Sequence, residues 1–586
     1  LISTGIESVK IKNQLEIITH KHHHSIYKLS YILKNGHNLE VSQMGVKNLE
    51  IEPHDNWVAK GFFDGDNYNY TGWSVLEIET NEQASDYEQA FSAGFLEGKL
   101  TKKLISLHLM NTVGDFCSDT STRICSKLID FLTNNFQWIN EQIEQNPNDP
   151  YWHHVNLVFA QFYGLYHGYY NLTVDLKNSP NVFKSMITDI KPYLNLLALQ
   201  LNGDISELFA SFSQVSDPFM AGSCSALVKL LDKELLVSHV TWGPYELLPN
   251  NQEIFVSHVT WTEYESMLRI AKNYKFNYHL NNLDSSVIPG SEIAFTSYPG
   301  ILASIDDFYV LKTNMVVMET TIGNSNVDLW KYVTTDSILY WVRVMLANRL
   351  SFTGVDWAKW FSLHNSGTYN NEWMIVDYKL FYPGEPLRQN LFIVLEQIPG
   401  QVKWEDKTET LASQSYWSSY NLASYPDIYN ISGTFDAYVK YGDFFSYQHS
   451  PRANIFRRDH SKVTDMESMI RLMRYNNYTK EPFSECECNP PYTGENTISA
   501  RSDLNPASGM YPFDALGHRD HGATDMKVTS FKMAREMEFI GISGPTHDDE
   551  DVPPFEWNKA DFGNTTNHFG HPEKWEFKPY HFVWKF

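Results

Sequence analysis

The spacing of apolar residues predicts helices in the first half of the chain. Ile124, Leu128, Leu132, Phe136 and Ile139 recur at helical spacing, and this predicts a helix from about residue 122 to 144. The proline-rich stretch 146–150 ends it. Similar patterns predict helices in the regions 155–170 and 195–213, whereas residues 1–110 have the pattern of short strands separated by turns.

After about residue 224 the pattern changes to short apolar runs typical of strands. Strands are expected at 256–261, 308–311, 373–378 and 391–395, and helical spacing returns at 328–350 and 465–475. Residues 264–270 also have helical spacing. Because the strands are grouped, with helices before and after them, the pattern indicates a layered α+β fold.

One twelve-residue segment occurs twice. Residues 235–246 recur as 254–265, so the motif His-Val-Thr-Trp is present as His239–Trp242 and as His258–Trp261. Only one copy can be the return strand beside residues 224–231. A tight turn at Asp232–Lys233 would use the first copy and place His239 opposite Ala226.

The second copy requires residues 232–248 to loop outward, and it would place His258 opposite Ala226. Two-residue hairpin turns prefer Asn-Gly or Asp-Gly, and a longer loop adds little closure entropy. We therefore expect His258 and Trp261 near Cys224, with His239 and Trp242 as the alternative pair.

Composition excludes several classes of protein. The formal net charge is −24, and no basic run interleaved with aromatic residues is present, which argues against nucleic-acid binding. No uninterrupted stretch of 18 apolar residues occurs, so we expect no transmembrane segment. No Gly-x-Ser-x-Gly elbow, Walker motif or dinucleotide motif appears, and no cofactor is expected.

Paired cysteines and glycosylation sequons favour the secretory route. We expect the disulfides Cys117–Cys125 and Cys486–Cys488; the first would constrain the unfolded chain by roughly 2.5 kcal/mol. Five Asn-x-Ser/Thr sequons begin at Asn69, Asn171, Asn430, Asn477 and Asn564.

The fifth cysteine, Cys224, has no nearby partner in sequence. Small residues precede it at 221–223 and an apolar run follows at 225–231. A lone thiol at the start of a strand suits a nucleophile, since thiolates are intrinsically reactive. The alternative is a buried free cysteine that packs as a small hydrophobic residue.

Metal binding finds weak support in the sequence. The histidine tract at 20–24 has no carboxylate or cysteine partners, and His518 and His521 lack a third ligand. We expect no metal site.

Several blocks in the second half resemble the phospholipase B-like family of lysosomal hydrolases, in the family's order from about residue 220 to 545. These blocks are 222–231, 257–261, 365–371, 396–400, 451–456 and 499–506. The resemblance implies an N-terminal nucleophile hydrolase with a four-layer αββα sandwich. It also implies that the precursor cuts itself between Ser223 and Cys224, which gives fragments 1–223 and 224–586 that build one unit.

The same resemblance suggests roles for individual residues. Asn421 would donate to the oxyanion, and Arg452 would line the pocket with His258 and Trp261. Thr321 would lie near the Cys224 amine, with Thr320 as its rival, since neighbouring residues in a strand face opposite ways.

Two functions are compatible with these features. The first is a hydrolase of the lysosome lumen, or a secreted one, that deacylates an amide, a peptide or a phospholipid ester through an acyl-enzyme on Cys224. Its partner would be this small acyl substrate, and a homodimer is possible. The second is a secreted or lysosomal glycoprotein with a lapsed active site that acts as a binding protein.

Overall fold

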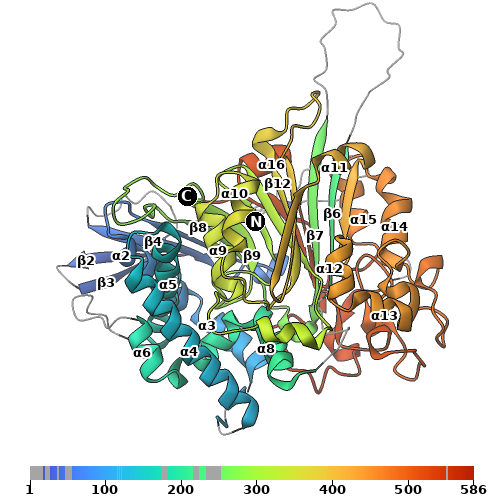
Figure 1. Ribbon diagram of the computed structural model, residues 1–586, viewed down its shortest axis with the longest axis horizontal. Helices are drawn as coiled ribbons and strands as arrows, with labels where there is room; N and C mark the ends of the chain where they lie inside the picture. Colours follow the sequence, from blue (N-terminus) through green and yellow to red (C-terminus); the bar gives the residue numbers. More distant parts are fainter. Residues whose placement is uncertain are drawn as a thin grey trace, which may run out of the picture.

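The structure is a computed structural model, and it confirms the α+β class predicted from the sequence. It describes residues 18–19, 27–35, 38–46, 56–114, 116–117, 119–120, 122–172, 182–215, 223–231, 252–548 and 552–586. Two large sheets lie in the middle of the molecule, and helices cover their outer sides (Figure 1).

The larger sheet has eleven strands within the described residues. All neighbouring strands are antiparallel except β5 and β8, which run parallel. In spatial order the strands are β14 (Gln401–Asp406), β13 (Phe392–Ile398), β12 (Asn371–Asp377), β11 (Met315–Thr321), β10 (Phe308–Leu311), β9 (Glu292–Ser297), β8 (Ile270–Lys275), β5 (Ser74–Thr80), β4 (Trp57–Asp64), β2 (Tyr27–Asn35) and β3 (Asn38–Val46).

The smaller sheet contains the strand that begins just before Cys224. Its order is β1 (Ile18–Thr19), β21 (Tyr580–Phe582), β18 (Phe539–Ser543), β17 (Asp525–Ser530), β7 (Glu253–Glu263), β6 (Ser223–Leu231) and β15 (Tyr416–Ser419), and β16 (His521–Ala523) also pairs with β7. A separate pair joins β19 (Phe555–Glu556) to β20 (Lys574–Trp575).

The helices form two groups and a few short elements. Against the larger sheet lie α2 (Asp86–Leu100), α3 (Lys102–His108), α4 (Arg123–Gln145), α5 (Pro150–Tyr170), α6 (Val182–Thr188), α7 (Leu194–Gln200), α8 (Asn202–Ser213), α9 (Tyr340–Leu350) and α10 (Gly354–Ser362). Against the smaller sheet lie α13 (Thr434–Tyr441), α14 (Pro451–Asp459) and α15 (Met466–Met473). Shorter helices elsewhere are α1 (Tyr68–Thr71), α11 (Thr408–Gln414), α12 (Pro426–Ile431) and α16 (Phe531–Arg535).

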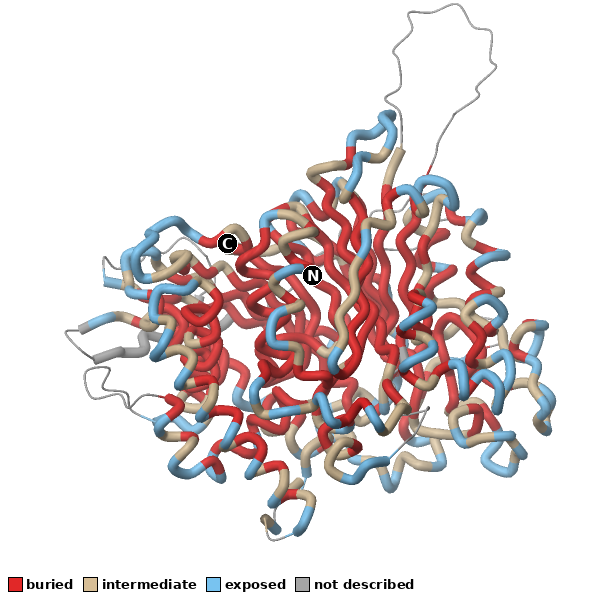
Figure 2. The backbone as a smooth tube through the Cα atoms, in the orientation of Figure 1, coloured by how far each residue is buried: buried red, intermediate tan, exposed pale blue. Residues whose placement is uncertain are grey.

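A continuous apolar core fills the space between the two sheets. Val228 and Val256 of the smaller sheet pack there with Val316 and Met374 of the larger one, and all four side chains are fully buried. Buried backbone runs without interruption through this region (Figure 2). Both sheets are therefore buried on two faces, which explains why their strands read as apolar runs and not as alternating patterns.

The segment before Cys224 is an integral part of this fold. Strand β5 lies inside the larger sheet, between β8 and β4, and Ser74 pairs with Ile270 of β8. Residues on both sides of the expected cleavage point thus build the same sheet.

Most predicted elements are found close to their expected positions. The helix predicted at 122–144 is α4, and strand β10 has the predicted bounds 308–311. The helix predicted at 328–350 is a 3-10 turn, Val327–Tyr332, followed by α9. Residues 264–270 are not a helix: a 3-10 turn, Tyr264–Ser266, leads into β8.

The main omission is helix α2, in a region expected to hold only strands and turns. Twelve of its fifteen residues are buried, so it has no polar stripe from which helical periodicity could be recognised. It begins with a capping box, Ser85 and Glu88, which was the available signal.

The disulfide bonds join Cys117 to Cys125 and Cys486 to Cys488, as expected, and Cys224 is a free buried thiol. Of the five sequon asparagines, Asn477 is half-buried and the other four are exposed. Among the described residues, no helix has the length and apolar character needed to cross a bilayer.

Helices α2 and α5 cross so closely that glycine is required at the contact. A Cβ atom on Gly94 would lie 1.8 Å from the carbonyl oxygen of Gln161, and one on Gly164 would lie 2.0 Å from that of Phe91. The backbones of the two helices therefore touch with no side chain between them.

We predict that Gly94→Ala lowers the free energy of unfolding by about 3 kcal/mol or more, the upper end of the usual cost of overpacking, because backbone atoms must separate. Denaturant unfolding measures this. Gly65→Ala is the control, since its added methyl group would meet only the ring end of Phe63. Equal stability of the two variants would contradict the close crossing.

Candidate active site

The pairing of β6 with β7 fixes the position of Cys224. Cys224 is opposite Thr260, and Ala226 is opposite His258. This is the register expected if the second copy of the repeated motif forms the return strand. The first copy, with His239 and Trp242, lies outside the described residues, as does the histidine tract at 20–24.

Strand alternation divides the nearby side chains between two faces. Ala226 and Val256 belong to the core between the sheets, so Cys224 and His258 face the larger sheet. Trp261 belongs to the core on the opposite face, under α14 and α15. Trp261 is therefore near Cys224 along the strand, and it lines the cavity at Cys224 from the opposite face of the sheet.

Asn421 and Arg452 hold the backbone of Cys224. The Cys224 N–H donates to Oδ1 of Asn421 (3.0 Å), and the Arg452 guanidinium donates to the Cys224 carbonyl oxygen (2.5 Å) and to the same Oδ1 (2.8 Å). Because two donors meet this atom, it must be the amide oxygen. Arg452 also donates to the Tyr420 carbonyl (2.8 Å) and stacks on Trp261 at 4.4 Å.

The amide nitrogen of Asn421 points the other way. Its Nδ2 donates to the carbonyl oxygen of Thr321 (2.7 Å), and Thr321 lines the cavity at Cys224. Its rival Thr320 instead pairs its hydroxyl with that of Ser419 (2.5 Å). The structure therefore brings Thr321, and not Thr320, to the cavity beside Cys224.

A cavity of about 380 Å³ opens at Cys224. Its wall combines polar groups with aromatic rings, a composition typical of small-molecule sites. Residues that line it include Glu207, Cys224, Thr260, Trp261, Thr321, Tyr369, Tyr420, Asn421, Phe444, Arg452 and Glu495.

Cys224 lines the cavity and His258 lies behind it, and both side chains are held in their neutral forms. Burial raises the pKa of the Cys224 thiol well above its usual range, and the nearby carboxyl of Glu319 raises it further. Burial also lowers the pKa of His258 well below its usual range, with help from the charge of Lys527. The site thus holds a thiol beside a neutral imidazole.

Sequence reasoning did not identify Glu319 or the charged network beneath it. Glu319 accepts a hydrogen bond from the Tyr369 hydroxyl (3.0 Å). Lys527 donates to Thr260 (2.6 Å) and to Asp525 (2.7 Å). The available signal was an acidic residue within a strand, directly after the apolar run Met315–Met318, because a buried carboxyl in a strand normally has a specific partner.

His518 and His521, the two histidines with metal-ligand spacing in the sequence, interact with different partners. His518 pairs with Asp561 (2.9 Å), whereas His521 faces Glu495 (3.8 Å) at the cavity wall. Burial alone would raise the pKa of Glu495, but Arg519 and His521 outweigh it and lower that pKa to about 2.

Three acidic residues lie close together near the cavity. Burial, followed by the charges of Glu263 and Asp520, raises the pKa of Glu265 to about 7. Glu263 itself lines the cavity. A carboxyl with a raised pKa stabilises the fold below its unfolded-state pKa, and this stabilisation is lost as pH rises toward 7.

We predict that Glu265→Gln stabilises the protein relative to wild type at pH 8, and that the difference shrinks as pH falls from 7 toward 4.5. Unfolding midpoints measured across this range test it. Glu481→Gln should instead destabilise the protein at pH 8. Burial raises the pKa of Glu481, but hydrogen bonds from Arg458 outweigh this and lower it, so its ionised form stabilises the fold. A constant difference for Glu265→Gln would contradict the raised pKa.

Comparison with known proteins identifies relatives over almost the whole chain. The family model described as Phospholipase B matches residues 59–248 and 246–582. The two matched pieces meet between the two copies of the repeated motif. The chain is 44% identical over 524 residues to phospholipase B-like 2 of Homo sapiens. This alignment covers 88% of this chain and 84% of that protein.

Relatives from two other organisms match as well. Identity is 41% over 539 residues to phospholipase B-like 1 of Caenorhabditis elegans, with 90% of this chain and 88% of that protein covered. It is 36% over 520 residues to phospholipase B-like protein B of Dictyostelium discoideum, with coverages of 86% and 82%. On this evidence, the chain belongs to the phospholipase B family.

Proposed function

We propose that this protein is an N-terminal nucleophile hydrolase that cuts itself between Ser223 and Cys224. The freed Cys224 then deacylates a small substrate, an amide or a phospholipid ester. The observation that carries the proposal is the hydrogen bond from the Cys224 nitrogen to Asn421 (3.0 Å) at the mouth of a cavity. The atom that would become the catalytic amine is already oriented.

The order of the layers supports this mechanistic class. Helices, the larger sheet, the smaller sheet and a second set of helices follow one another across the molecule (Figure 1). We infer that this is the four-layer αββα sandwich of N-terminal nucleophile hydrolases, with the nucleophile at the start of a strand of one central sheet.

Self-cleavage would be an acyl shift from nitrogen to sulfur. The Cys224 sulfur bonds to the Ser223 carbonyl carbon, the C–N bond breaks, and the thiol proton ends on the freed amine. Because the thiol is protonated at rest, a base must move this proton; His258, kept neutral by burial, has a ring nitrogen within 4.8 Å of the sulfur and would move the proton through one bridging water. Water then hydrolyses the thioester and leaves Cys224 as the new N-terminus.

In turnover the freed amine would replace His258 as the base. Its ordinary pKa of about 7.7–8.0 suits proton transfer near neutral pH, and Asn421 and Arg452 would hold it next to the sulfur. The thiolate attacks the substrate acyl carbon, and water releases the acyl group. The second N–H of the Asn421 amide, the one not donated to Thr321, and backbone N–H groups would stabilise the oxyanion.

Cellular location follows from the covalent chemistry of the chain. Two disulfides form only in an oxidising compartment, and four exposed sequon asparagines are accessible to glycosylation. We infer that the protein is lysosomal or secreted.

We predict that Cys224→Ala abolishes self-cleavage, since no other side chain can convert the Ser223 amide to a thioester. Wild type should give fragments of about 26 and 42 kDa from the 67.8 kDa chain, and the larger should begin at Cys224. Ser225→Ala, the neighbouring hydroxyl, is the control and should still cleave. Cleavage of purified Cys224→Ala would contradict the mechanism. Wild type that never cleaves would favour a binding protein.

We predict that Asn421→Ala lowers kcat about 100-fold with little change in KM, as expected for loss of one oxyanion donor. Since Asn421 also orients the amine, the acid limb of the pH–rate profile should move. Asn202→Ala, which lines the same cavity from α8, is the control. A kcat for Asn421→Ala close to that of Asn202→Ala would remove Asn421 from the mechanism.

A further inference from the structure

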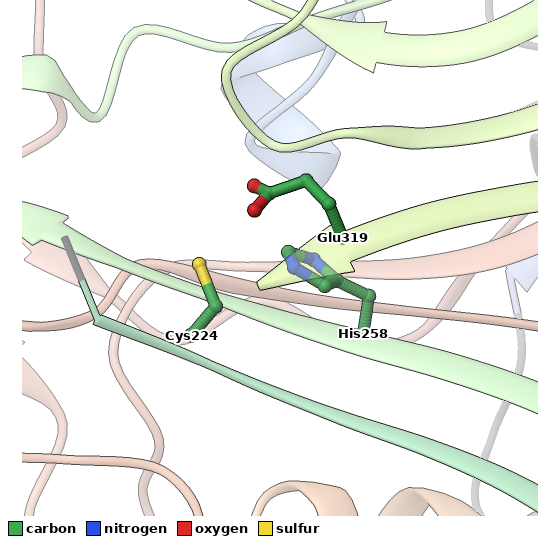
Figure 3. A group of neighbouring side chains, drawn as sticks. All are labelled: Cys224, His258 and Glu319. Atoms are coloured by element: carbon green, nitrogen blue, oxygen red, sulfur yellow. The ribbon is translucent and has the colours of Figure 1, made fainter. Parts of the chain in front are cut away.

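Three metal-ligating side chains converge behind the cavity floor. Cys224 on β6, His258 on β7 and Glu319 on β11 each offer one ligand atom, and these atoms all lie within 4.8 Å of one another. The sulfur, the imidazole ring and the carboxylate lie close together in the space between the two sheets (Figure 3). Within the described part of the chain, no other group of three such ligands is found.

Three polar atoms of this cluster lack a hydrogen-bond partner among the described residues, although the other carboxyl oxygen of Glu319 accepts from Tyr369. Both ring nitrogens of His258 and the Oε2 atom of Glu319 are buried without a hydrogen-bond partner among the described residues. The His258 side chain is fully buried. Buried polar atoms are nearly always satisfied, by protein, water or an ion, because an unmet hydrogen bond costs about 1–3 kcal/mol. Three such atoms beside a thiol point to a missing ligand.

The charges around the cluster indicate that this ligand is a cation. Glu319 and Asp307 lie close together, since the Tyr369 hydroxyl lies 3.0 Å from an oxygen of each carboxyl group. The nearest cations are already engaged: Arg269 pairs with Asp306 and Asp525, and Lys527 with Asp525. Among the described residues, neither Glu319 nor Asp307 forms an ion pair with a lysine or an arginine, and the ion pairs nearby are made by Asp306 and Asp525.

The ligand types select among metals. Thiolate, imidazole and carboxylate are the donors that Zn²⁺ takes in proteins, most often four in a tetrahedron. Mg²⁺ and Ca²⁺ prefer oxygen atoms alone. Because Cys224 also lines the cavity, a fourth position would open toward it.

We propose that Cys224, His258 and Glu319 form a zinc site, and that Zn²⁺ bound there blocks the nucleophile reversibly. On binding, Zn–S, Zn–N and Zn–O bonds form, and the thiol proton, with the carboxyl proton if present, leaves to solvent. Only the inhibitory consequence rests on the proposed function. The binding itself does not.

The first test measures binding without any activity. The full chain is used with the histidines at 20 and 22–24 replaced by serine, so that metal held by this tract is not counted. Zn²⁺ is titrated against a coloured chelator, and Cd²⁺ is used to detect a thiolate-to-metal absorption band. Since the other four cysteines form disulfides, such a band reports Cys224. One equivalent of metal and a band are expected.

Variants then locate the site. Cys224→Ser should abolish the Cd²⁺ band, and His258→Gln and Glu319→Gln should weaken Zn²⁺ binding by at least about 100-fold, the upper end for loss of a supporting group. His108→Gln is the matched control, because His108 is also fully buried with both ring nitrogens unpartnered. It should bind as wild type does.

Failure of a variant to fold does not leave the proposal untested, because the wild-type titration and Cd²⁺ band stand alone. Absence of that band, or zinc affinity unchanged in all three variants, would overturn the site.

The second test concerns inhibition. When free Zn²⁺ is at 100 times the Kd of this site, only about one molecule in 100 remains free of metal. Self-cleavage should then be about 100-fold slower, and a chelator should restore the rate. If the metal binds but metal-free protein never cleaves, the proposed function fails and the site stands. If metal-free protein cleaves and zinc binds without slowing it, the inhibitory role is wrong.

Discussion

The register of β6 against β7 is the constraint on which the site depends. Side chains alternate along a strand, so a slip of one residue would turn Cys224 away from the larger sheet and His258 with it. The register places Cys224 opposite Thr260, and Thr260 is itself held by Lys527 of β17. The positions of β6, β7 and β17 therefore depend on one another, because a slip of β7 would also separate Thr260 from the buried charge of Lys527.

The Arg452 guanidinium converts this register into a defined geometry at one peptide unit. It joins the Cys224 carbonyl, the Asn421 side chain and the Tyr420 carbonyl. These belong to segments far apart in sequence. The planar fork of an arginine presents its donors in a fixed geometry, whereas a lysine ammonium is a point charge on a flexible stem. Stacking on Trp261 restricts the remaining freedom of the group.

Features of the fold and the site that leave a local pattern in the sequence were predicted, whereas features that depend on contacts between distant residues were not. Helix α4 was predicted because one face is apolar, and the poor fit of Asp232–Lys233 to a tight hairpin turn favoured the register later found for His258. Helix α2 was missed because it is buried on nearly every side. Glu319 was missed because its importance arises from residues distant in sequence, Tyr369 and Cys224, which only the folded chain brings together.

The parallel pairing of β5 with β8 has a consequence for the life of the molecule. Cutting the chain before Cys224 would leave these strands in the same sheet but on separate polypeptides. Folding before the cut is unimolecular, whereas recovery after denaturation would require two chains to find each other at cellular concentrations. The native state would then have been formed by a chain that was still continuous. After the cut it would persist because unfolding is slow, and not because folding and unfolding are in reversible equilibrium.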